Sequence, residues 1–288
     1  MNRILVPTDF SEQSKFALDF SSQVAGLNGG SITLLNVIDY PGLSTVWMGG
    51  LNVIGGSEPP VDTADETFIN NLIEKAKEDL NSLIRNLNIS GVSIIPKVLI
   101  GNPYFCITEE IHNENIEVVI MGTKGISGIE EILIGSTTEK VVRLARCPVI
   151  TIKQNKKTGE IRNIVFASDF EEDQDYIVGQ LMNMQQLFKA KLHLVKINTP
   201  NNFQTNTLMM REMEDFAGKY KLTDFTLNFY NEYTEEDGII RFAEEIDADL
   251  IAMATHGRTG LMHLLSGSIA EDVVNHAKRP VWTCRIKK

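Results

Sequence analysis

The chain has 288 residues, of which 43% are hydrophobic and 23% charged, which is typical of a soluble globular protein long enough for two domains. Its formal net charge of −11 argues against a general affinity for DNA, RNA or an anionic membrane surface, because these partners need a broad basic face. The three cysteines lie far apart with no Cys-x-x-Cys pair, so neither a disulfide framework nor a zinc site is indicated.

The sequence also favours a cytoplasmic location. A reducing compartment suits the cysteine usage, and the amino-terminal residues lack the long apolar region of a signal peptide. No run of about 20 apolar residues is available to span a membrane. We therefore expect a protein that is neither exported nor inserted into a membrane.

The first half of the chain alternates strand and helix patterns. Short apolar runs that are almost uninterrupted predict strands buried on both faces, at residues 4–6, 32–38, 92–100, 118–121 and 149–152. Between them, apolar residues at helical spacing form a short stripe at Ala17, Phe20 and Val24. They form a longer stripe at Ile69, Leu72, Ile73, Ala76, Leu80, Leu83, Ile84 and Leu87. This alternation predicts βαβ units and hence a parallel sheet of the α/β class.

The second half repeats this order, with predicted strands at residues 164–167, 192–197, 225–230, 250–253 and 281–284. A polar stretch at 154–160 separates the halves, so we expect domains at 1–154 and 161–288. Asp9 corresponds to Asp169 at an offset of 160, whereas Gly125 corresponds to Gly257 at an offset of 132. The second copy therefore lacks 28 residues, most of them after its second strand.

The extra residues of the first copy include a segment at 41–56 that is punctuated by glycines yet apolar, an unusual mixture for a solvent loop. It is either a flap or docking segment near a ligand, or a mobile insertion without a role. The sequence does not decide between them.

A glycine motif occurs once in each copy, at 121–128 and 253–260, and each is followed several residues later by Gly-Ser before a helix pattern. Glycines at this spacing, followed by a helix start, allow backbone N–H groups to surround phosphate oxygens. The repeat therefore makes a nucleotide the first ligand to consider.

In the first copy, strand one ends in Pro7-Thr8-Asp9 and strand four in Met121-Gly122, and parallel α/β sheets bind ligands beyond such strand ends. Asp9 can accept hydrogen bonds from a ribose or an adenine edge. The phosphates would meet glycine backbone, a helix start and one lysine, at Gly122, Lys124, Gly125, Gly135, Ser136, Thr137 and Thr138. Taken singly, Asp9 before Phe10-Ser11 and Gly135 before Ser136 are equally typical of plain helix caps.

The string Pro7-Thr8-Asp9-Phe10-Ser11, together with Gly-x-x-Gly, nine residues and Gly-Ser, resembles the universal stress protein family, and the resemblance covers both halves. It implies two repeated five-stranded parallel-sheet α/β sandwich domains, Rossmann-like and similar to the adenine nucleotide alpha hydrolases. In that family this glycine pattern marks members that bind ATP. By resemblance, Pro7, Thr8, Asp9 and Val37 would frame the adenosine, and the residues from Gly122 to Thr138 named above would hold the phosphates.

The second copy keeps Asp169, Gly257, Gly260, Gly267 and Ser268 but departs elsewhere. Ala254 stands in the place of Gly122, and Ile269-Ala270 in the place of Thr137-Thr138, so a methyl group is added and two hydroxyls are lost. Arg258 adds a charge that the first copy lacks. We expect nucleotide binding in the first copy and leave it open in the second.

Each copy closes with an apolar strand after a proline, at 147–152 and 279–284. A strand at a sheet edge invites pairing. By resemblance to the family's dimers, the two closing strands would pair within the chain as an intramolecular pseudo-dimer, with Trp282 in the interface. A homodimer of whole chains stays open.

Other catalytic patterns are absent from the sequence: a P-loop, a Rossmann Gly-x-Gly-x-x-Gly after strand one and a hydrolase nucleophile elbow. His256 and His263 have no third ligand at convincing spacing. The leading hypothesis is a nucleotide-dependent stress-response sensor or regulator that binds ATP, with Mg²⁺ accompanying the phosphates, and acts on an unidentified protein partner. The alternatives are a slow ATP hydrolase or phosphotransferase, and an interaction scaffold that binds no nucleotide.

Overall fold

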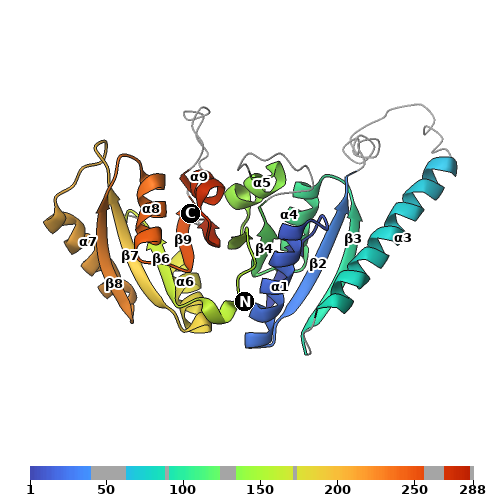
Figure 1. Cartoon of the computed structure of the whole chain (residues 1–288), viewed down its shortest axis with the longest axis horizontal. Coiled ribbons are helices and arrows are strands. Elements are labelled where there is room, and N and C mark those ends of the chain that lie inside the picture. Colours follow the sequence, from blue (N-terminus) through green and yellow to red (C-terminus); the bar gives the residue numbers. More distant parts are fainter. Residues whose placement is uncertain (40–62, 88–90, 124–133, 171–173, 256–268, 286–288) are drawn as a thin grey trace.

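A computed structural model describes residues 1–39, 63–87, 91–123, 134–170, 174–255 and 269–285, and within them one sheet of ten strands runs through the whole molecule (Figure 1). The strand order is β3-β2-β1-β4-β5-β10-β9-β6-β7-β8. Each half contributes five neighbouring strands in the same internal order, so the sheet consists of two copies of one βαβ arrangement.

The elements of the first half follow one another as strand and helix in strict alternation. Their bounds are β1 Arg3–Pro7, α1 Glu12–Asn28, β2 Ser31–Ile38, α3 Thr63–Asn86, β3 Ser93–Ile100, α4 Pro103–Asn113, β4 Val118–Gly122, α5 Ser136–Leu144 and β5 Val149–Ile152. A short 3₁₀ helix, η1, covers Thr158–Glu160 and leads into the second half.

The second half repeats the alternation. Its elements are β6 Asn163–Ala167, α6 Asp175–Phe188, β7 Lys191–Asn198, α7 Asn206–Tyr220, β8 Phe225–Asn231, α8 Glu235–Glu245, β9 Leu250–Thr255, α9 Ile269–His276 and β10 Val281–Arg285. Each of the ten strands predicted from apolar runs is present, with ends shifted by at most two residues. The parallel pairing within each half is confirmed as well.

The two halves join through their closing strands. β5 and β10 pair antiparallel, with Trp282 opposite Ile150 and Thr283 opposite Val149. The Thr151 hydroxyl donates to the Val281 carbonyl, at 3.3 Å, and the Trp282 side chain is fully buried. The predicted pairing of these strands within one chain is therefore confirmed, and it leaves β3 and β8 as the outer strands of the sheet.

Helices cover both faces of the sheet and enclose one apolar core on each. α1, α3, α6 and α7 pack on one face, and α4, α5, α8 and α9 on the other. The core under the first face runs across the seam, where the rings of Phe20 in α1 and Phe188 in α6 lie 6.3 Å apart. The halves thus share a core as well as a strand pair.

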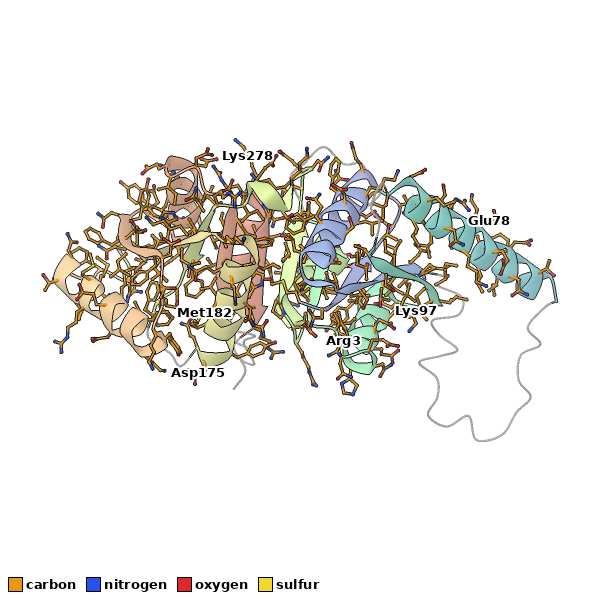
Figure 2. All side chains as sticks on the ribbon, turned by 90° about the horizontal axis from the view of Figure 1, so that it is seen from below. Arg3, Glu78, Lys97, Asp175, Met182 and Lys278 are labelled. Atoms are coloured by element: carbon orange, nitrogen blue, oxygen red, sulfur yellow. The ribbon has the colours of Figure 1, made fainter. Side chains whose placement is uncertain are left out.

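The length difference between the halves lies after the second strand, as predicted. β2 and β7 have eight residues each, but α3 has 24 residues and its counterpart α7 only 15. Figure 2 shows α3, which carries Glu78, reaching beyond the rest of its half. The apolar segment at 41–56 lies outside the described residues, so its predicted role stays a prediction.

Candidate functional site

The end of β1 forms a tight turn in which the side chains of Thr8 and Asp9 hold the backbone. Thr8 Oγ1 accepts the Phe10 N–H at 3.1 Å, and Asp9 Oδ1 accepts the Ser11 N–H at 3.1 Å. These bonds support a left-handed backbone at Phe10, with φ of 66°. The second carboxylate oxygen of Asp9 bonds to none of the described residues, so it remains available to a ligand hydroxyl.

Thr8 is fixed further by its neighbours. Its hydroxyl lies 2.9 Å from the Ser14 hydroxyl in α1, its N–H donates to the Leu35 carbonyl, and its carbonyl accepts the Asn36 side-chain amide at 2.8 Å. Because Thr8 and Asn36 are both buried, this network sets where Asp9 stands. Pro7 and Val37 lie half-buried at the same strand ends, and their role in framing an adenosine stays a prediction.

Gly122 ends β4, next to β1, and the structure gives it a different physical reason from the one predicted. A Cβ at this position would lie 2.8 Å from the Gln13 carbonyl carbon and 2.9 Å from the Ser14 nitrogen. The start of α1 therefore occupies the space that a side chain would need. Gly122 thus leaves room for the start of α1. Its predicted contact with the phosphates stays a prediction.

The start of α5 is a helix N-terminus without a side-chain cap. Gly135 is its N-cap and makes no side-chain capping bond, and its own N–H donates to the Thr123 carbonyl at 2.8 Å. The first N–H groups inside a helix lack intrahelical partners and carry the positive end of the helix dipole. Those groups belong here to Ser136, Thr137 and Thr138.

Four other described helices have a side-chain cap at their start, whereas α6, like α5, has none. The capping residues are Ser11 for α1, Asn102 for α4, Thr205 for α7 and Thr234 for α8. Where those residues supply an oxygen, α5 has a glycine. The first turn of α5 therefore has no side-chain capping bond at its N-cap.

Thr138 and Met121, which the sequence places near the site, both have structural contacts. The Thr138 hydroxyl donates to the Gly122 carbonyl at 3.1 Å and so ties α5 to the end of β4, whereas Ser136 is exposed and Thr137 half-buried. Met121 is 4% exposed within the core, so its side chain is used for packing. Lys124 and Gly125 lie outside the described residues.

The second copy repeats the turn of the first copy with different side chains. Ser168 Oγ accepts the Phe170 N–H at 3.1 Å, and Phe170 has φ of 61°. Gln174 stands in the place of Ser14 and donates from Nε2 to Ser168 Oγ at 2.9 Å and to Asp169 Oδ1 at 3.4 Å. Asp169 is therefore held by a side-chain amide, whereas Asp9 accepts a backbone N–H.

The helix after this turn begins later in the second copy than in the first. α1 begins at Glu12, three residues after Asp9, whereas α6 begins at Asp175, six after Asp169. The Tyr220 hydroxyl accepts the Gln174 N–H at 3.0 Å and covers this start. Ala254 stands at the position that corresponds to Gly122. Gly257, Gly267 and Ser268 lie outside the described residues.

One residue near the site was missed by sequence reasoning. Asn275, in α9 of the second half, accepts the Ile134 N–H at 2.8 Å, directly before Gly135. These residues are 141 positions apart, and neither belongs to the repeated motif. Only the antiparallel seam, which brings α5 against α9, makes the contact visible.

The comparisons with known proteins decide the family. The profile of the "Universal stress protein family" matches residues 1–153 and 160–285. The chain belongs to the universal stress protein family. The two matched segments correspond to the two halves of the sheet, so the chain is a tandem, two-domain member.

Some relatives match about half of this chain, and others match nearly all of it. Universal stress protein MJ0577 of Methanocaldococcus jannaschii is 29% identical over 153 residues, which cover 53% of this chain and 94% of that protein. Universal stress protein Slr1230 of Synechocystis is 24% identical over 99% of this chain and all of that protein. The crystal structure of a universal stress protein from Archaeoglobus fulgidus superposes with a TM-score of 0.76 at 23% identity, covering 99% of this chain and 98% of that one, which supports the fold.

No described helix is long and apolar enough to cross a membrane. Within the described residues there is also no group of three or more His, Cys, Asp or Glu side chains placed to hold a metal ion. The site is therefore best described by its backbone donors and by Asp9.

Proposed function

We propose that the first domain binds an adenine nucleotide, with ATP as the leading candidate, and that nucleotide occupancy sets the conformation or the partners of the protein. The observation that carries the proposal is the start of α5, whose glycine N-cap offers backbone donors without a capping side chain. Because β1 lies beside β4, the Asp9 carboxylate stands at the neighbouring strand end. Family membership supports the same ligand class.

Each part of the nucleotide has a suitable partner. The free carboxylate oxygen of Asp9 would accept a ribose hydroxyl, with Pro7, Thr8 and Val37 framing the adenosine. The phosphates would accept N–H groups of Ser136 and Thr137, with help from the dipole of α5. Lys124 and a Mg²⁺ ion carried by the phosphates would offset the phosphate charge, and Gly125 would offer its backbone N–H.

The second domain is proposed to bind nucleotide weakly or not at all. Asp169 is held by Gln174, Tyr220 covers the start of α6, and Ala270 offers no hydroxyl where Thr138 stands. Gly257, Gly267 and Ser268 keep the glycine pattern of the first copy. Divided at 1–154 and 161–288, the chain would then be a cytoplasmic regulator with one nucleotide-bound and one divergent domain.

Calorimetric titration of the full chain with ATP tests this proposal. We expect one ATP per chain, an affinity about tenfold lower in Asp9→Ala because a hydrogen bond to a charged group is lost, and no change in Asp169→Ala. Absence of binding would contradict the proposed function and favour a scaffold. Two sites per chain would contradict the asymmetry, and steady phosphate release from the pure protein would favour a hydrolase.

A further inference from the structure

The end of the segment before α5 is held by a residue of the other domain. Ile134 immediately precedes Gly135, the N-cap of α5, and its N–H donates to Oδ1 of Asn275 at 2.8 Å. Asn275 lies in the last turn of α9. Figure 1 shows α5 and α9 facing one another above the seam of the sheet.

Asn275 is itself fixed by the first domain. Lys153, which follows β5, donates from Nζ to the Asn275 backbone carbonyl at 2.5 Å. α5 and α9 are also linked directly, by an ion pair between Arg143 Nη1 and Glu271 Oε1 at 3.9 Å. The Lys153 bond therefore holds the Asn275 backbone against the first domain, where the Asn275 side-chain oxygen accepts the Ile134 N–H.

Two hydrogen bonds set the position of this backbone. Gly135 N–H bonds to Thr123 within the first domain, and Ile134 N–H bonds to Asn275 across the seam. The N–H groups of α5 bind an anion best when their direction is fixed before the ligand arrives, because no ordering cost is then paid on binding. The cross-domain bond contributes directly to that order.

We propose that Asn275 is a positioning residue for the phosphate end of the nucleotide site in the first domain, so that this site is complete only when the second domain is docked. This inference rests on the proposed function of the first domain. It makes the interface between α5 and α9 a route by which a change in the second domain alters nucleotide affinity in the first.

The first domain does not offer an equivalent acceptor to the second domain at the corresponding position. Asn275 stands eight residues after Gly267, and the residue eight after Gly135 is Arg143. A guanidinium group has only donors, so Arg143 cannot accept a backbone N–H as the Asn275 side chain does. The anchor therefore serves the first domain alone, in keeping with the proposed single site.

The test compares Asn275→Leu with Arg143→Ala in the full chain. Leucine removes the acceptor with little change in size, whereas Arg143→Ala breaks the other link between α5 and α9 and leaves the Ile134 bond intact. For Asn275→Leu we expect ATP affinity to fall about three- to tenfold and adenosine affinity to stay at the wild-type value, because only the phosphate end depends on α5. Arg143→Ala is expected to bind both ligands like the wild type.

Asn275→Ala removes the same acceptor without adding apolar volume, and the same loss is expected if the leucine variant is too unstable to titrate. Unchanged ATP affinity in a variant without the acceptor, or an equal loss for ATP and adenosine, would overturn the inference. Failure of the wild-type protein to bind ATP would instead overturn the proposed function.

Discussion

The two domains follow the same path along the chain but differ at one corner, where the first strand meets its helix. In the first domain α1 begins close to Asp9 and packs so tightly on the end of β4 that only Gly122 fits. In the second, α6 begins later, Gln174 donates a hydrogen bond to Asp169, and Ala254 stands in the place of Gly122. The later helix start thus accompanies a different set of side chains around the turn that both domains share.

At the amino-terminal edge of the sheet, by contrast, the two domains are alike. In the first domain Glu117 accepts the Asn2 N–H at 2.8 Å, and in the second Asp249 accepts the Arg162 and Asn163 N–H groups at 2.9 and 3.0 Å. A carboxylate thus holds the entry to the first strand in both copies. The difference between the domains is concentrated at the carboxyl edge, where ligands bind in parallel sheets.

The largest expected effect comes from adding a side chain at the end of β4. Gly122→Val must displace the Gln13 and Ser14 backbone, so we expect ATP binding to fall below detection and the protein to lose about 1–3 kcal/mol of stability. Ala254→Val, its counterpart, meets a helix that already starts later and is expected to keep full ATP affinity. Calorimetry and urea unfolding measure both, and equal loss of ATP binding in the two variants would remove the distinction between the domains.

A smaller effect on ATP binding is expected at the equivalent positions of the second strands, where the buried Lys196 corresponds to Asn36. Lys196 Nζ donates to Glu212 Oε2 at 2.6 Å, whereas Asn36 donates to the Thr8 carbonyl. Lys196→Met leaves the Glu212 charge without this partner and is expected to cost about 3 kcal/mol, at the low end for a broken buried pair because Glu212 is partly exposed.

Asn36→Ala, the matched variant, is expected to cost about 1 kcal/mol for one lost hydrogen bond but to weaken ATP binding, because it releases Thr8. Urea unfolding ranks the two stabilities, and calorimetry separates their effects on binding. Weaker ATP binding in Lys196→Met than in Asn36→Ala would show that the second strand of the other domain controls the site.

The smallest effect on ATP binding is expected at the shared amino-terminal edge, where the effect on stability depends on pH. Burial opposes ionisation of Asp249, but hydrogen bonds from Arg162, Lys156 and Asn163 outweigh it and hold the pKa of Asp249 below its usual value. Since the folded pKa is lowered, its stabilisation is present above the usual carboxyl pKa and is lost as pH falls through the lowered value.

Asp249→Asn is therefore expected to cost about 1–3 kcal/mol at neutral pH and progressively less in acid, as followed by urea unfolding across the acid range. Glu117→Gln should behave in the same way, because the pKa of Glu117 is also lowered: burial again opposes ionisation, and the Asn2 N–H bond offsets it. A cost that does not change with pH would show that the Asp249 charge is not what stabilises this edge.

Much of the fold could be predicted because its determinants are local. Apolar runs predicted the ten strands. The pairing of the two closing strands was instead expected from the resemblance to the family's dimers, and β5 and β10 do pair. The glycine repeat indicated α5 as an anion-binding helix start, and Gly135 does lack a capping side chain.

The roles of Gly122, Thr138 and Asn275 could not be predicted in this way. Gly122 is set by how closely α1 approaches β4, and Thr138 by the packing of α5 on the strand end. Asn275 depends on contact between helices that are far apart in the sequence. Such distances arise only when the elements assemble, and no motif spacing encodes them.

The antiparallel seam has a consequence for how the two halves change over time. In a pair of identical subunits every substitution occurs twice, so Gly122 in one subunit could never face Ala254 in the other. Joining the halves through β5 and β10 of one polypeptide keeps them together at high effective concentration while each accumulates its own substitutions. Covalent linkage thus permits a division of labour that a symmetric assembly forbids.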